Sequence, residues 1–121
     1  DYTNEEETAE EINRISTEYN YLIDTHTAVA MHCAEKYLSN VDNNRKLLVV
    51  STASPYKFSP SVYYALTKKS FENELDAVGA LEKLTGVPVP GPLCGIEKRE
   101  IRFAPENSIR PDEMEEAVLK F

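Results

Sequence analysis

The sequence has few of the residues from which several common functional sites are built. Its 121 residues include four glycines, two cysteines and no tryptophan. They contain neither a glycine-rich phosphate loop nor a Gly-x-Ser-x-Gly nucleophile elbow. Cys33 and Cys94 are too few for a disulfide framework and do not stand in a metal-binding spacing. The sequence therefore carries no signature of a P-loop protein, a serine hydrolase or a zinc module, and its cysteines suit a reducing cytoplasm.

Positive charge and long apolar runs are also scarce. Lys and Arg together number 13 against 21 Asp and Glu, which gives a formal net charge of −8. A protein that neutralises nucleic-acid phosphates needs a basic face. A membrane-spanning helix needs roughly 20 consecutive apolar residues, and neither such a run nor a signal-peptide pattern occurs. We therefore expect no nucleic-acid partner and no membrane partner.

Hydrophobic residues recur at helical spacing along most of the chain. Thr8 and Glu11 have the spacing of a capping box and predict that a first helix begins there. Asp24 is a suitable N-cap for a second helix, and Ser59 followed by Pro60 suits the start of a third. The predicted helices cover about residues 8–21, 24–39, 59 onward, 73–84 (ended by Gly86) and 111–121. The side chains expected to face inward are Ile12, Ile15, Tyr19, Leu22 and Ile23, then Ala30, Cys33, Ala34 and Tyr37, then Val62, Ala65 and Leu66, then Leu75, Val78, Leu81 and Leu84, and finally Met114, Ala117, Val118 and Phe121.

One strand stands out among these helices. Leu47–Val50 is the only continuous aliphatic run, and it predicts a strand buried on both faces, as in a parallel sheet flanked by helices. Arg99–Phe103 is a marginal second strand. The order of helix, helix, strand, turn and helix is typical of α/β proteins. One good strand would leave its edges unpaired, so the chain is either mostly helical or, as we prefer, part of a larger sheet.

A cluster of hydroxyl groups follows the predicted strand, from Ser51 to Ser54. Ligands of open α/β sheets bind beyond the carboxyl ends of the strands. Ser51 and Thr52 are therefore candidates to hydrogen-bond a neutral ring nitrogen or an anion. The alternative is that these hydroxyls bond only the backbone of their own turn. Lys57, just behind the turn, is either an anion partner or a solvated lysine.

The start of the second helix is another candidate site, because Asp24, His26 and Thr27 stand together there. His26 is suited to act as an acid or base or to donate to a phosphate. The alternative is a half-buried imidazole beside a helix cap. His26 and His32 are six residues apart and lie on different faces of a helix, so we expect no two-histidine metal site.

Two linked segments resemble motifs of the threonine synthases. Residues 21–30, YLIDTHTAVA, resemble the "IDPHTAVG" segment of that family, and residues 49–58, VVSTASPYKF, resemble its "VVxSTAHPxKF" segment. Their order and spacing fit, and residues 84–90 also look like the family's tail, so the resemblance covers nearly the whole chain. The sequence departs from the family at Thr25, where proline is usual, and at Ala30, where glycine is common. Thr25 keeps a residue suited to capping, so we expect little functional cost.

The resemblance implies a fold and an activity. Threonine synthases are longer chains of two α/β domains with pyridoxal 5′-phosphate (PLP) in the cleft between them. They are carbon–oxygen lyases acting on phosphates, and they convert O-phosphohomoserine and water to L-threonine and phosphate in threonine biosynthesis. On this basis residues 1–121 form a single domain, the C-terminal part of the cofactor domain. Its fold class is then α/β, as a helix-rich fragment with few strands of the doubly wound, tryptophan-synthase-β-like fold (fold type II).

The resemblance also implies roles for the hydroxyl turn. The Thr52 hydroxyl is expected to hydrogen-bond the pyridine nitrogen of PLP, with Ser51 beside it. A neutral hydroxyl does not force that nitrogen to be protonated, which favours elimination chemistry over transamination. Other residues are expected near the site without an assigned role, namely Asp24, His26, Thr27 and Lys57. No metal ligand is expected.

The family's Schiff-base lysine and its phosphate-binding glycine loop lie in upstream segments that have no counterpart in this sequence. We therefore expect no catalytic residue in this chain, which begins at Asp1 rather than at a methionine. The expected partner is the remainder of the synthase, and residues 1–121 alone are predicted to be inactive. The alternative is a stand-alone small binding or interaction module derived from the same fold.

Overall fold

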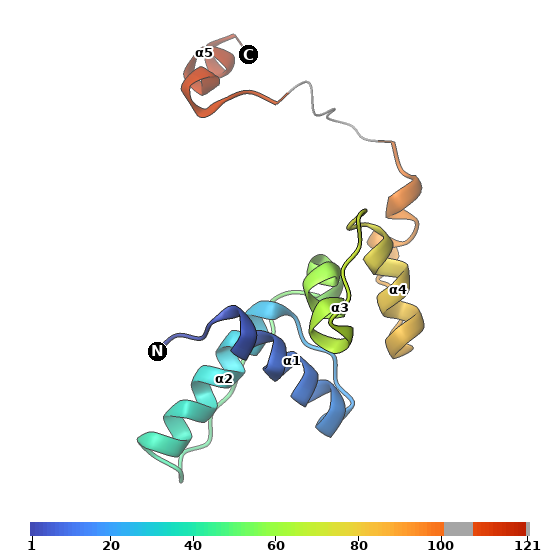
Figure 1. Ribbon diagram of the computed structural model, residues 1–121. Helices are drawn as coiled ribbons and strands as arrows, with labels where there is room; N and C mark the ends of the chain where they lie inside the picture. Colours follow the sequence, from blue (N-terminus) through green and yellow to red (C-terminus); the bar gives the residue numbers. More distant parts are fainter. Residues whose placement is uncertain (101–107, 121) are drawn as a thin grey trace.

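The computed structural model describes residues 1–100 and 108–120, and every regular element within those ranges is a helix (Figure 1). The α-helices are α1 (Glu5–Tyr19), α2 (Thr25–Asn40), α3 (Ser59–Thr67), α4 (Asp76–Thr85) and α5 (Met114–Leu119). The 3₁₀ helices are η1 (Pro55–Phe58), η2 (Gly91–Leu93), η3 (Ile96–Lys98) and η5 (Pro111–Glu113). No helix in these ranges is both long enough and apolar enough to cross a membrane.

Helix α1 begins earlier than predicted. Its N-cap is Asn4, whose Oδ1 accepts a hydrogen bond from the Glu7 backbone N–H at 2.9 Å. The Glu7 carboxylate in turn accepts from the Asn4 N–H at 2.9 Å. The capping box predicted for Thr8 and Glu11 is therefore wrong. The earlier box adds a turn of helix and places three glutamates at its positive end, where they are favourable.

Helices α1 to α4 share one apolar core (Figure 1). Helix α1 contacts both α2 and α3, and α3 contacts α4. The buried core residues are Ile12, Ile15, Ile23, Ala28, Tyr56, Val62, Ala65, Val78 and Leu81. Seven of the side chains predicted to face inward are among them: Ile12, Ile15, Ile23, Val62, Ala65, Val78 and Leu81. Helical spacing therefore identified the core-facing stripes of α1, α3 and α4.

Several other predicted inward-facing side chains are exposed instead, namely Tyr19, Ala30, Leu75, Leu84, Met114 and Val118. Met114 and Val118 belong to α5, which lies apart from α1 to α4 in Figure 1 and contacts η5 just before it. Their side chains have no core to enter within the described part of the chain. Phe121, predicted for the same face, lies outside the described residues.

The strand predicted at Leu47–Val50 is wrong for this chain. These residues have no regular secondary structure, and the side chains of Leu48 and Val50 are 89% and 67% exposed. A strand exists only where a second strand pairs with its backbone, and none of the described residues supplies one. Arg99 lies outside any strand, and most of the second strand candidate falls outside the described residues. The helix-rich character is confirmed, whereas the sheet is not found in the described ranges.

Local signals set the remaining helix ends. Ser59 is the first residue of α3 rather than its cap, because η1, capped by Ser54, runs directly into α3. The predicted stop at Gly86 is confirmed. Gly86 has a φ of 71° and donates its N–H to the Glu82 carbonyl at 2.8 Å. Glycine adopts this left-handed conformation without the clash that a Cβ would cause.

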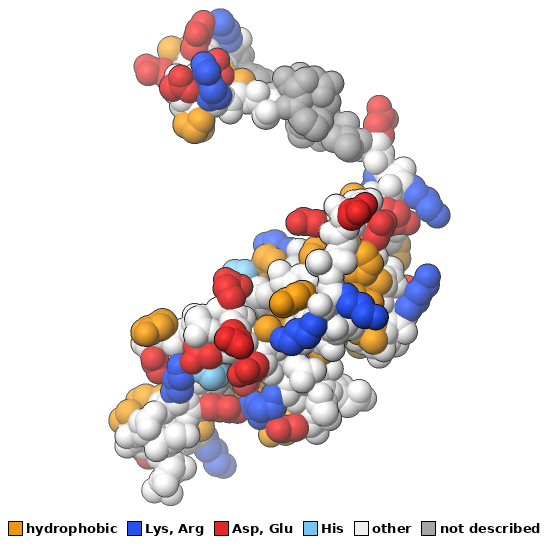
Figure 2. All heavy atoms as spheres, viewed as in Figure 1, with side chains coloured by type: hydrophobic (Ala, Val, Ile, Leu, Met, Phe, Trp, Pro, Cys, Tyr) orange, Lys and Arg blue, Asp and Glu red, His pale blue; other side chains and the backbone are white. Residues whose placement is uncertain are grey.

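Acidic and basic side chains are interspersed over α1 to α4 on the face seen in Figure 2. Neither sign covers that face continuously, although acidic residues outnumber basic ones in the sequence. A continuous basic surface of the kind that binds nucleic-acid phosphates is therefore not present on that face.

Candidate functional site

The two segments singled out in the sequence meet at one hydrogen bond. The hydroxyl of Thr27, in the first turn of α2, lies 3.1 Å from the hydroxyl of Ser51. Helix α2 carries the chain away from Thr27, and the irregular residues that follow return it to the same place (Figure 1). Three of the six predicted site residues, Asp24, Thr27 and Ser51, are thereby brought together.

Asp24 fixes the α2 side of this contact. Its carboxylate is fully buried and caps the helix by accepting the His26 N–H at 2.9 Å. Its other oxygen accepts a hydrogen bond from the Thr27 hydroxyl. Burying a carboxylate is costly unless its oxygens are hydrogen-bonded. Both Asp24 oxygens are bonded, so the position of this side chain is set by the start of α2.

The number of hydrogens on the two hydroxyls fixes the direction of the contact. A hydroxyl carries one hydrogen, and an ionised carboxylate can only accept. Because the Thr27 hydroxyl donates to Asp24, its oxygen accepts the hydrogen of Ser51. Ser51 is therefore left with acceptor capacity only.

Thr52 differs from its neighbour. Its side chain is exposed, and no hydrogen bond to it is formed from anywhere in residues 1–100 or 108–120. Its hydroxyl therefore keeps a hydrogen to donate. Of the two adjacent hydroxyls, Thr52 is the one that can donate to an outside acceptor such as a ring nitrogen.

His26 and Lys57 both lie close to the ring of Phe58. The His26 and Phe58 ring centroids are 4.8 Å apart, and the Lys57 ammonium lies 5.3 Å from the Phe58 centroid. The His26 side chain is 66% exposed, with Nδ1 3.3 Å from an Asp24 oxygen. Neither His26 nor Lys57 bonds the hydroxyl turn within the described residues. His26 lines a separate hollow, with Glu5 and Val29, rather than the one against the Thr27–Ser51 contact.

A comparison with protein families covers most of the chain. Residues 27–118 match the family described as "Threonine synthase, C-terminal". The chain belongs to this family. A search of curated proteins found no match.

The match to the threonine synthase C-terminal family contains the whole second motif and most of the site. It begins at Thr27 and includes Ser51, Thr52 and Lys57. The family expected from the two short motifs is thereby confirmed. Asp24 and His26 lie just before the matched range. No group of three metal-binding side chains occurs in the described ranges of this threonine synthase family member.

An open groove of about 420 Å³ lies against the Thr27–Ser51 contact in this threonine synthase family member. Besides those two hydroxyls, its lining residues are Ile15, Tyr19, Tyr21, Ile23, Met31 and Val49. Sequence reasoning missed this groove. Tyr19 was predicted to lie in the core. Nothing in the sequence indicates that Val49 would form no strand pair and would leave this side of α1 and α2 uncovered.

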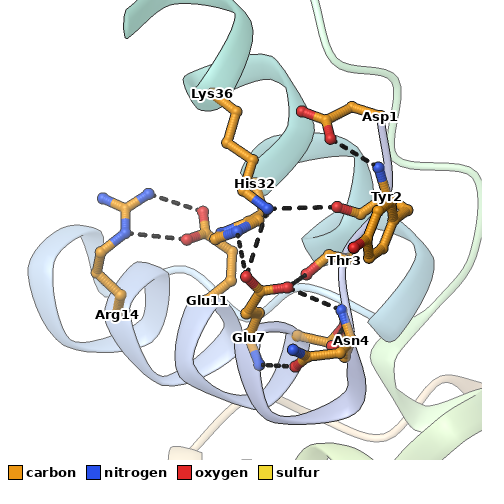
Figure 3. Close-up of polar contacts among 10 residues, drawn as sticks. Asp1, Tyr2, Thr3, Asn4, Glu7, Glu11, Arg14, His32 and Lys36 are labelled. Carbon is orange, nitrogen blue, oxygen red and sulfur yellow. Dashed lines mark hydrogen bonds and ion pairs between the residues drawn. The ribbon is translucent and has the colours of Figure 1, made fainter. Parts of the chain in front are cut away.

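A cluster of charged side chains links α1 to α2 (Figure 3). The Lys36 ammonium of α2 lies 3.4 Å from the Glu7 carboxylate of α1, and His32 lies 3.7 Å from the same oxygen. The hydrogen bond from the Asn4 backbone N–H is the main cause that lowers the pKa of Glu7. Desolvation, the next largest effect, opposes it, and hydrogen bonds from Thr3 and Lys36 add to the lowering. This cluster joins the start of α1 to the middle of α2.

Arg14 makes the second link between these helices. Its guanidinium donates to both carboxylate oxygens of the buried Glu11, at 2.7 and 3.1 Å, and also to Glu18 and to Glu35 of α2. The hydrogen bonds to Glu11 are the main cause that raises the pKa of Arg14. Together with the Glu7 cluster, Arg14 links α2 to α1.

Proposed function

We propose that this chain forms the part of a PLP-dependent threonine synthase that faces the pyridine ring of the cofactor. The complete enzyme converts O-phosphohomoserine and water to L-threonine and phosphate. The observation that carries the proposal is the Thr27–Ser51 hydrogen bond. It joins the two segments that resemble the family and leaves the neighbouring Thr52 hydroxyl exposed, with a hydrogen to donate.

The side chains at this turn fit the pyridine nitrogen of PLP. The carboxylate that bonds Thr27, that of Asp24, is fully buried, and both its oxygens already accept hydrogen bonds from the first turn of α2. A neutral donor such as Thr52 suits an unprotonated ring nitrogen, whereas a carboxylate would accept a hydrogen bond from the protonated nitrogen and stabilise that charged form. PLP supplies an electron sink when it is bound, and a neutral partner at the nitrogen moderates that sink in favour of elimination chemistry.

The work assigned to this chain is binding and orientation. Thr52 holds the nitrogen edge of the ring, and Ser51 holds the turn against α2. His26 and Lys57 are near the site and receive no further role. The Schiff-base lysine, the phosphate loop and the strands of the sheet are assigned to the rest of the synthase. Two free cysteines, Cys33 and Cys94, suit an enzyme of the reducing cytoplasm.

The test compares Thr52→Val with Thr52→Ser in the full chain that carries this segment. Losing one neutral hydrogen bond costs about 1 kcal/mol, so Thr52→Val should weaken PLP binding roughly fivefold and slow turnover. Thr52→Ser keeps the hydroxyl and should retain most of both. Absorbance titration gives the PLP affinity, and phosphate release gives the turnover. Unchanged PLP affinity and turnover in Thr52→Val would contradict the assignment.

A second measurement tests the division of work. Residues 1–121, purified alone, should release neither threonine nor phosphate from O-phosphohomoserine in the presence of PLP. Threonine formation by the isolated segment would contradict the assignment of the Schiff-base lysine to the rest of the synthase. PLP binding without turnover would favour a stand-alone binding module derived from the same fold.

A further inference from the structure

We infer that Thr27 is a positioning residue for the cofactor-facing turn, and that it acts by holding Ser51 so that Thr52 donates outward. This inference rests on the proposed function, because it concerns how Thr52 is presented to PLP. Thr27 itself does not touch the cofactor in this assignment. Its hydroxyl is buried between the Asp24 carboxylate and the Ser51 hydroxyl.

The direction of the Thr27 hydroxyl is fixed by Asp24. Asp24 is fully buried, and its two oxygens accept from the His26 N–H and from Thr27. The carboxylate cannot turn without breaking the helix cap. The Thr27 hydrogen therefore points at Asp24, and the Thr27 oxygen is left to accept from Ser51.

Apart from the bond to Thr27, few contacts hold the hydroxyl turn in place. Residues 45–50 have no regular secondary structure. Within the described ranges, the only hydrogen bond that links residues 46–53 to another part of the chain is that between Ser51 and Thr27. The turn is next fixed at Ser54, whose hydroxyl caps η1. Removing the Thr27 hydroxyl would free the turn over the residues that include Thr52.

The neighbouring hydroxyls of Ser51 and Thr52 differ in whether they have a hydrogen to donate to a ligand. While Ser51 donates to Thr27, it has no hydrogen for a ligand, and Thr52 is the donor that remains. If the Thr27 oxygen is lost, the Ser51 hydrogen becomes free and competes with Thr52 for the same ring nitrogen. Thr27 thus determines which hydroxyl meets the acceptor as well as where the turn lies.

The experiment uses the full synthase chain with three variants at buried threonines. Thr27→Val removes the hydroxyl at nearly constant shape, and Thr27→Ser keeps it. Thr8→Val is the matched control, because Thr8 is also buried and helical but bonds only to the Asn4 carbonyl of its own helix. PLP affinity is measured by absorbance titration, the spectrum of bound PLP reports its ring environment, and the melting temperature without PLP reports folding.

Thr27→Val should weaken PLP binding roughly threefold to tenfold, the range expected for one net hydrogen bond, and should shift the spectrum of bound PLP. Thr27→Ser should restore both, and Thr8→Val should change neither. Ser51→Ala removes the same bond from the other side. The double variant that combines Thr27→Val and Ser51→Ala should therefore lose no more PLP affinity than whichever single variant loses more.

The inference is overturned if Thr27→Val lowers only the melting temperature and leaves PLP affinity and spectrum unchanged. If Thr27→Val fails to fold, Ser51→Ala tests the inference in its place, because Ser51 is exposed and its substitution should not prevent folding. Unchanged PLP affinity in Ser51→Ala then overturns the inference as well. Thr52→Val, measured alongside, separates this failure from a failure of the proposed function. If Thr52→Val weakens PLP binding and Thr27→Val does not, only the positioning role is lost. If neither variant affects PLP, the cofactor assignment itself is wrong.

Discussion

The hydroxyl of Tyr56 donates a hydrogen bond to the backbone carbonyl of Val87, although 31 residues separate them. Tyr56 follows the hydroxyl turn directly, and Val87 follows the end of α4. The Tyr56 ring is buried in the shared core of α1 to α4. This bond therefore ties the segment that follows Ser51 and Thr52 to the residues just after α4.

The first prediction concerns the Tyr56 bond and alkaline pH. Burial raises the pKa of Tyr56 above 10.0, and the nearby Glu82 carboxylate acts in the same direction, against a hydrogen bond with Thr85. Folding therefore favours the protonated phenol, so stability should be unaffected below about pH 10 and should fall as pH rises through the folded-state pKa. Tyr56→Phe should cost about 1 kcal/mol at pH 7 and should lessen the alkaline loss.

Urea denaturation between pH 7 and 11.5 checks this prediction. Tyr2→Phe is the control, because Tyr2 is 79% exposed and its substitution should leave the pH profile unchanged. An alkaline loss of the same size in wild type and Tyr56→Phe would show that another group causes it.

The second prediction concerns Arg14, which joins α1 to α2. Arg14→Ala leaves the Glu11 carboxylate buried without its bidentate partner, and an unsatisfied buried group of this kind costs about 1–3 kcal/mol. Arg14→Lys should recover only part of this loss, because an ammonium cannot reproduce the two parallel bonds to Glu11. The free energy of unfolding from urea titrations gives the comparison.

The control for Arg14 is an exposed ion pair in the same chain. Arg45 lies 3.2 Å from Asp42, and its side chain is 61% exposed. Arg45→Ala should change the free energy of unfolding by roughly 0–0.5 kcal/mol. Equal losses in the two alanine variants would mean that the Arg14 bonds stabilise the fold no more than a surface pair does.

Two features set by neighbouring residues were predicted correctly, whereas the local capping signal of α1 was assigned to Thr8 and Glu11 although Asn4 and Glu7 form the box. The Asp24 cap and the Gly86 stop depend on hydrogen bonds within one turn of their own helix, and both were found. Leu47–Val50 failed as a strand because strand formation depends on a pairing partner, which residue types within the run do not specify. Its aliphatic composition describes a segment suited to burial, whereas the described chain leaves it exposed.

The candidate site shows the same limit. Ser51 and Thr27 were each singled out, but their contact depends on the path of the irregular residues after α2. No periodicity fixes that path. The buried Asp24 carboxylate was predicted as a cap, and its second bond, to Thr27, follows from the i to i+3 spacing at a helix start. The groove beside them depends on what remains uncovered, which sequence patterns do not encode.

The third prediction concerns the capping box of α1 at acidic pH. Because the pKa of Glu7 is lowered from its usual 4.5, the stability that its carboxylate contributes should be fully present above about pH 4.5. It should be lost as pH falls through the folded-state pKa. Glu7→Gln keeps a hydrogen-bond acceptor without the charge, so its stability should fall less steeply between pH 5 and 3. Thermal melts across that range, with the exposed Glu10→Gln as control, test this. Parallel profiles for wild type and Glu7→Gln would count against it.

The fourth prediction compares two glycines, Gly79 inside α4 and Gly86 at its C-cap. Gly79 lies inside the helix, and a Cβ added there would meet no atom within 4 Å. Gly79→Ala should therefore stabilise the fold by roughly 0.5–1 kcal/mol, since alanine loses less backbone entropy in a helix. Gly86 has equally open space but a φ of +71°. Gly86→Ala should destabilise the fold by about 1–2 kcal/mol, the cost of a left-handed conformation for an L-residue.

Urea midpoints of the two variants should thus move in opposite directions at unchanged m-value. Neither new methyl group makes a contact. A rise of both midpoints would therefore mean that the left-handed conformation at Gly86 costs an L-residue little, and a fall of both would contradict the prediction for Gly79.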